Sequence, residues 1–142
     1  MKMNMTHISA LTINDFTQYK ETQTQRRNRH KEKYPRQSWA AYAKRDAKKR
    51  AEKKGVPFNL TREYIESILP THCPVFNTPF QYGGNGKIKP ESPALDRIVP
   101  SLGYIEGNVH IISVKANNIK SAYSAQEVMI VAKWLESMEK PE

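Results

Sequence analysis

The segment 93–121 constrains the fold of this chain most, because four kinds of local signal follow one another within it. A short apolar run is interrupted by the adjacent charges of Asp96 and Arg97, and turn-forming prolines, glycines and an asparagine follow. A second apolar run covers 109–114, and a polar, helix-compatible segment comes after it. This order predicts a strand, a structured loop, a second strand and the start of a helix.

Asp96 and Asn117 are candidate metal ligands in this arrangement. Asp96 closes the first predicted strand, and Asn117 lies in the predicted helix. The two can converge, and a carboxylate with an amide oxygen forms a hard oxygen set that suits Mg²⁺ or Mn²⁺ beside a phosphate. Considered alone, Asp96 could equally cap a loop or form an ion pair. Asn108 follows Gly107 and could equally be an ordinary turn residue.

Asp96, Asn108 and Asn117, in this order, resemble the HNH or ββα-metal nuclease motif, particularly that of phage-type HNH-like endonucleases. The resemblance covers roughly residues 73–120, about a third of the chain. It implies a ββα-metal core, and with the flanking helices and the basic N-terminal arm inferred from the rest of the sequence the expected fold is α+β. It also implies that Asp96 and Asn117 hold the metal, while Asn108 ties the loop between the strands.

Arg97 departs from this motif, because it stands where the family places its general-base histidine. A guanidinium stays protonated and offers only donors, so it cannot accept a proton from water. We expect Arg97 to clamp the phosphate or to stabilise the transition state. The base is then His110, His72 or a metal-bound hydroxide, and the alternation along the second strand does not decide which way His110 points.

The cysteine pairs that form a zinc knuckle in many family members are also missing. Cys73 is the only cysteine, and a structural zinc needs four ligands, so no structural zinc is expected. Within the resemblance, Cys73 is a remnant of the first knuckle position and Phe76 replaces its partner. Ser113 and Ala116 occupy the positions of the second pair, and apolar packing is expected to replace the metal.

Positive charge is concentrated in the first part of the chain. The net charge is +9, with 15 Lys and Arg against 5 Asp and Glu in residues 1–60, and 8 against 9 in residues 61–142. A solvated surface is one explanation, but the density of charge favours a nucleic acid, most simply double-stranded DNA. The residues that we expect to contact DNA are Lys44, Arg45, Lys48, Lys49, Lys53, Lys115 and Lys120.

The chain divides into a basic N-terminal arm, 1–36, and an HNH-like nuclease domain, 37–142. The arm has few apolar residues, so a helix within it would have little apolar surface to bury. We therefore expect the arm to be partly flexible. An alanine-rich stripe then predicts a helix over 38–54, with Ser38 as N-cap and Gly55 just past its end.

Two further helices are predicted by their caps. Thr61 begins the first, which runs to Ile68, and Ser124 with Glu127 has the spacing of a capping box at the start of the second, 124–138. Apolar residues recur at helical spacing in the second, which predicts that it packs on the core through Val128, Ile130, Val131, Trp134, Leu135 and Met138.

No stretch of the sequence indicates a membrane or an export signal. No apolar run approaches the roughly 20 residues that cross a bilayer, and the N-terminus lacks the apolar core of a signal peptide. A single cysteine is consistent with a reducing compartment. We therefore expect a soluble protein in the cytoplasm, that of a bacterial host if the protein is phage-encoded; its oligomeric state is left open.

Two functions of different classes follow from these observations. The first is a divalent-metal-dependent DNA endonuclease, which the presence of Asp96, Asn108 and Asn117 favours. The second is a non-catalytic nucleic-acid-binding or inhibitor protein that retains the HNH scaffold, which the absence of a histidine at position 97 favours.

Overall fold

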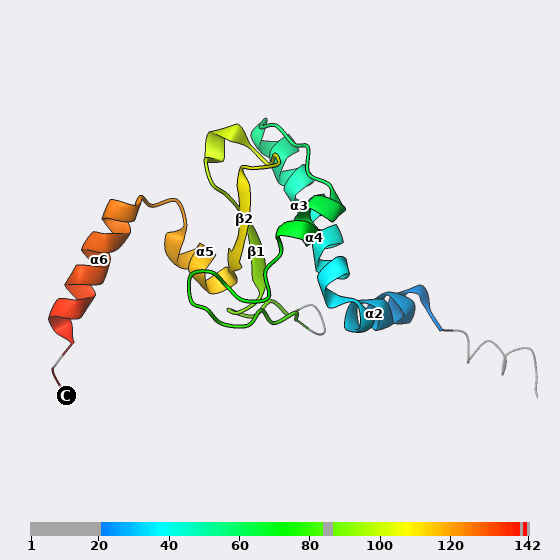
Figure 1. Ribbon diagram of the computed structural model, residues 1–142, viewed down its shortest axis with the longest axis horizontal. Coiled ribbons are helices and arrows are strands. Elements are labelled where there is room, and N and C mark those ends of the chain that lie inside the picture. The colour runs from blue at the N-terminus through cyan, green and yellow to red at the C-terminus, as the bar shows by residue number, and fades with distance from the viewer. Residues whose placement is uncertain (1–20, 84–86, 140, 142) are drawn as a thin grey trace, which may run out of the picture.

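The computed structural model describes residues 21–83, 87–139 and 141, and has an α+β fold in which helices surround one small antiparallel sheet (Figure 1). None of the described helices combines the length and the apolar character needed to cross a membrane. The described elements are, in chain order, α2 (Gln23–Lys33), α3 (Pro35–Lys54), α4 (Arg62–Ile68), β1 (Pro93–Arg97), η3 (Pro100–Leu102), β2 (Val109–Ser113), α5 (Val114–Lys120) and α6 (Ala125–Met138).

The two strands form the predicted strand–loop–strand–helix unit. β1 pairs with β2 in a register that sets Asp96 opposite His110 and Arg97 opposite Val109. β2 leads directly into α5, whose N-cap is Ser113: its Oγ accepts a hydrogen bond of 3.1 Å from the Ala116 N–H. The predicted order of elements is therefore confirmed.

α3 packs on the core through a stripe of alanines. Four of them, at helical spacing, are at most 3% exposed: Ala40, Ala43, Ala47 and Ala51. The helix begins at Pro35 rather than at the predicted Ser38, since a proline has no N–H to lose and its fixed φ suits the first helical position. The boundary expected between residues 36 and 37 therefore falls inside α3, while Gly55 ends the helix with φ +64°, as predicted.

α2 lies within the predicted arm and buries none of its residues, in keeping with its polar sequence. Its first turn is held by a capping box between Thr22 and Gln25, and Glu21 forms ion pairs with Arg26 and Arg29. Local capping and ion pairs therefore take the place of core packing in this helix. The remainder of the arm, residues 1–20, lies outside the described residues.

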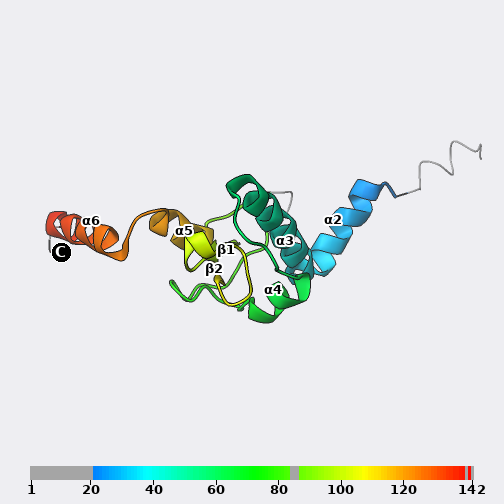
Figure 2. The same ribbon diagram turned by 90° about the horizontal axis from the view of Figure 1, so that it is seen from above.

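α6 begins as predicted but does not pack as predicted. Ser124 and Glu127 form the expected capping box, yet the helix has no buried residue, and Trp134 is 60% exposed. Ser121 ends α5 with a positive φ of 43°, and the chain then runs outward, so α6 and α2 lie at opposite ends of the molecule (Figures 1 and 2). The core-packing prediction for this helix was wrong, because the core is already enclosed by α3, α4 and the sheet.

Candidate functional site

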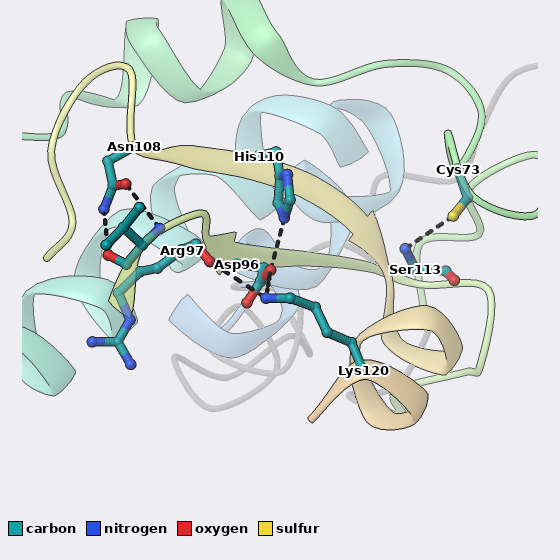
Figure 3. Close-up of polar contacts among 8 residues, drawn as sticks. Cys73, Asp96, Arg97, Asn108, His110, Ser113 and Lys120 are labelled. Atoms are coloured by element: carbon teal, nitrogen blue, oxygen red, sulfur yellow. Dashed lines mark hydrogen bonds and ion pairs between the residues drawn. The ribbon is translucent and has the colours of Figure 1, made fainter. Parts of the chain in front are cut away.

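Asp96, His110 and Lys120 form one polar cluster at the exposed side of the sheet (Figure 3). His110 Nε2 lies 2.7 Å from Asp96 Oδ2, and Lys120 Nζ lies 2.5 Å from the same oxygen. The Asp96 side chain is 16% exposed, whereas those of His110 and Lys120 are 42% and 40% exposed. A mostly buried carboxylate is thus held by two partners that still reach solvent.

The strand register decides where His110 points. Residues directly opposite each other in an antiparallel pair place their side chains on the same face of the sheet. Asp96 and His110 are such a pair, which answers the question that the sequence left open. His110 is therefore a member of the site, and its partner is the predicted metal ligand.

Arg97 is held away from this carboxylate, since neighbouring residues of a strand point to opposite faces. Its guanidinium donates a hydrogen bond of 2.8 Å to the Pro100 carbonyl and lies 5.0 Å from the ring centre of Tyr104. Arg50 lies 5.3 Å from the centre of the same buried ring. Cation–π contacts therefore fix two guanidinium groups beside one aromatic ring.

Asn108 holds the loop between the strands together. Its Oδ1 accepts a hydrogen bond from the Val99 N–H, and its Nδ2 donates to the carbonyls of Val99 and Gly103. The side chain is 5% exposed, so these bonds replace water that it cannot reach. The expected role of Asn108 in the loop is confirmed by these contacts.

One pocket joins the two predicted metal ligands. Asp96, Arg97, Asn117 and Lys120 all line it, together with Lys54 from the end of α3. Lys54 was not among the residues predicted for this site. It lies three residues after the buried Ala51, and this helical spacing indicated that it lies near the side of α3 that faces the core. The pocket thus carries one carboxylate, two amides and three cationic side chains.

The pocket offers oxygen ligands of the kind that a hard divalent cation prefers. Asp96 Oδ2 is occupied by His110 and Lys120, whereas Oδ1 has no hydrogen-bond partner among the described residues. The described part of the chain contains no cluster of three or more His, Cys, Asp and Glu side chains. A carboxylate with an amide oxygen suits Mg²⁺ or Mn²⁺, which keep several water ligands.

The basic residues predicted to contact DNA do not all gather at this pocket. Only Lys120 lines it, whereas Lys44 and Arg45 line a second depression between α3 and α4, together with Arg62. Lys115 lies 4.9 Å from the ring centre of Phe76. The other predicted contacts are exposed on α3: Lys48, Lys49 and Lys53.

Cys73 and Ser113 lie together at the position where the resemblance places a zinc knuckle. Both are at most 1% exposed, and the Ser113 N–H donates a hydrogen bond of 3.3 Å to Cys73 Sγ. Ala116 is buried nearby in α5, while Phe76 is 41% exposed. A thiol, a hydroxyl and a methyl group therefore occupy three of the four knuckle positions.

Comparison with known proteins gives one similar sequence. The chain is 32% identical over 80 residues, 56% of its length, to the uncharacterized 29.0 kDa protein in the dda-modA intergenic region of Enterobacteria phage T4. The matched stretch spans about a third of that phage protein, 31% of its length. No protein-family model matches the chain, and no solved structure matches it.

Proposed function

We propose that this protein is a divalent-metal-dependent DNA endonuclease of the phage HNH-like type, in which β1, β2 and α5 form the ββα-metal core. One observation carries the proposal: a single pocket gathers Asp96 from the end of β1 with Asn117 and Lys120 from α5, and the strand partner of Asp96 is His110. The similarity to a phage protein agrees with the phage type but says nothing of activity.

Asp96 and Asn117 are the residues that would hold Mg²⁺ or Mn²⁺. When bound, such an ion neutralises charge on the phosphate and makes water a better nucleophile. Asp96 contributes Oδ1, because its Oδ2 is already hydrogen-bonded to His110. The same carboxylate therefore both offers an oxygen to the cation and orients the imidazole.

His110 is the general base in this proposal. A neutral imidazole accepts a proton, which the guanidinium of Arg97 cannot do. The contact of 2.7 Å between Nε2 and Asp96 Oδ2 fixes the orientation of the ring. Lys54, Arg97 and Lys120 supply positive charge for the phosphate at the pocket, as oxyanion stabilisation requires.

DNA is the proposed substrate because of where the positive charge lies. The excess of basic residues falls before residue 61, and the exposed lysines of α3 belong to that part of the chain. A polyanion attracted to α3 would also meet Lys54 at the pocket. Charge on α3 thus positions the backbone, while the pocket cleaves it.

A specific contact favours the second candidate function, a nucleic-acid-binding or inhibitor protein without catalysis. The Lys120 ammonium already neutralises Asp96, at 2.5 Å. If Lys120 stays there, its ammonium neutralises Asp96 in place of the metal ion. The site would then bind phosphate without cleaving it. Cleavage assays distinguish the two functions.

The first experiment is cleavage of supercoiled plasmid in Mg²⁺, Mn²⁺ or EDTA. We expect the parent protein to cleave in either metal and not in EDTA. Asp96→Asn should abolish cleavage, since it removes the charged ligand, and His110→Gln should slow it about 100-fold or more, since glutamine cannot accept the proton. DNA binding should persist in both variants.

Asp46→Asn is the matched control, because Asp46 is a partly exposed carboxylate on α3 whose one ion-pair partner among the described residues is Arg50. It should cleave like the parent. Full cleavage by Asp96→Asn, or cleavage in EDTA, would contradict the metal site. A parent protein that binds DNA and cleaves under no divalent metal would establish the binding function instead.

A further inference from the structure

The outer helix α6 carries an apolar face that the described part of the chain leaves uncovered. Trp134 is 60% exposed and Ile130 is 62% exposed. Three neighbouring residues are each about half exposed: Val131, Leu135 and Met138. At 100° per residue these side chains lie within an arc of roughly 140°. We call these five residues the α6 apolar face.

This face is as large as the largest apolar patch of a typical monomer, and such patches are often functional. Half-exposed side chains of this size each present on the order of 100 Å², so the α6 apolar face presents about 500 Å². Apolar side chains scattered singly over a surface are normal, whereas a contiguous patch of a few hundred Å² is often functional. A helix of 14 residues that buries nothing is also marginally stable by itself in water. The helix therefore needs a partner.

We propose that the partner is α6 of a second copy of this chain, and that the protein forms a twofold dimer through antiparallel α6 helices. Two such faces would together bury about 1,000 Å², which is the size of a weak, reversible interface rather than a permanent one. An isologous contact needs only this one patch, because each copy supplies the same surface. The proposal is independent of the nuclease function.

Charge favours this end of the molecule for self-association. α6 carries only Glu127, Lys133 and Glu136, while the excess positive charge lies before residue 61. Since α2 and α6 lie at opposite ends of the molecule, two copies can meet at α6 without bringing their basic segments together (Figures 1 and 2). Glu127, which borders the face, is already held by Ser124 at 2.8 Å.

The test measures the molar mass of the full chain by light scattering over about a hundredfold range of concentration. We expect the mass to rise from 16.4 kDa toward twice that value. In a Trp39→Phe background, the emission of Trp134 should shift to the blue over the same range, because the indole becomes buried. Both changes should have the same midpoint.

The decisive variant is Val131→Glu with Leu135→Lys. Both sites are exposed, and a Glu–Lys pair at this spacing supports a helix, so the fold should be kept while the dimer is lost at every concentration. The matched control is Ala132→Glu with Glu136→Lys, which has the same spacing on the exposed side of α6 opposite the apolar face and should dimerise like the parent.

Three outcomes would overturn the proposal. Dimerisation of the Val131→Glu, Leu135→Lys variant would place the contact elsewhere. A parent that stays monomeric with Trp134 in water would mean that another protein covers α6. A monomeric parent with Trp134 already buried would mean that α6 folds onto its own chain.

Discussion

At the scale of single residues, Lys120 and a divalent cation compete for the same carboxylate. Lys120 Nζ contacts Asp96 Oδ2 at 2.5 Å, and because the Lys120 side chain is 40% exposed, solvent screens the pair and its contribution is modest. Lys120→Met keeps the length of the side chain and removes its charge. We expect it to bind Mn²⁺ about threefold more tightly, measured by calorimetry. Cleavage should nevertheless slow, because a charge at the phosphate is lost.

Lys115→Met is the control for this prediction, since Lys115 lies on the same helix but contacts the ring of Phe76. Its Mn²⁺ affinity should equal that of the parent. If Lys120→Met bound Mn²⁺ no better than the parent, Lys120 and the cation would not share Asp96, and the metal site would lie elsewhere.

At the scale of elements, packing between the turn at Cys73 and the start of α5 holds the sheet end in place. Cys73 and Phe76 have the spacing of one knuckle pair, as do Ser113 and Ala116. The triple variant Phe76→Cys, Ser113→Cys, Ala116→Cys should therefore gain a four-thiolate zinc site. We expect a tetrahedral Co²⁺ spectrum and a Tm higher by about 10 °C in zinc.

The double variant Ser113→Cys, Ala116→Cys, which has three thiols with Cys73, is the matched comparison and should bind Co²⁺ more weakly. A triple variant that binds no metal would mean that Phe76, exposed in this structure, does not face the other three positions.

At the scale of the whole molecule, the basic surface of α3 should govern affinity for DNA. None of Lys44, Arg45, Lys48 and Lys49 forms an ion pair with another described residue. Replacing all four by Gln should weaken binding to unrelated sequences alike and reduce the slope of log K against log salt by about 3. Fluorescence anisotropy over a salt series measures both.

Lys133→Gln, at the far end of the molecule on α6, should leave affinity and slope unchanged. If the quadruple variant bound DNA as tightly as the parent, α3 would not be the contact surface, and the arm or the pocket would have to carry the charge dependence.

The sequence by itself determined the features that depend on neighbours within a few residues. The strand–loop–strand–helix order, the caps at Thr61 and Ser124, and the left-handed end of α3 at Gly55 all formed where they were predicted. Asn108 bonds the loop as expected. Such signals are local, because a cap or a positive φ is set by a few adjacent backbone groups.

Tertiary structure alone decided which residues meet. The register of β1 and β2 placed His110 beside Asp96, and the guanidinium of Arg97 packs against the ring of Tyr104 instead of pairing with Asp96. Periodicity correctly gave α6 an apolar face, but it could not say what covers that face. Whether an apolar stripe is buried depends on the space that the other elements leave, and here the alanines of α3 and the strands had already filled the core.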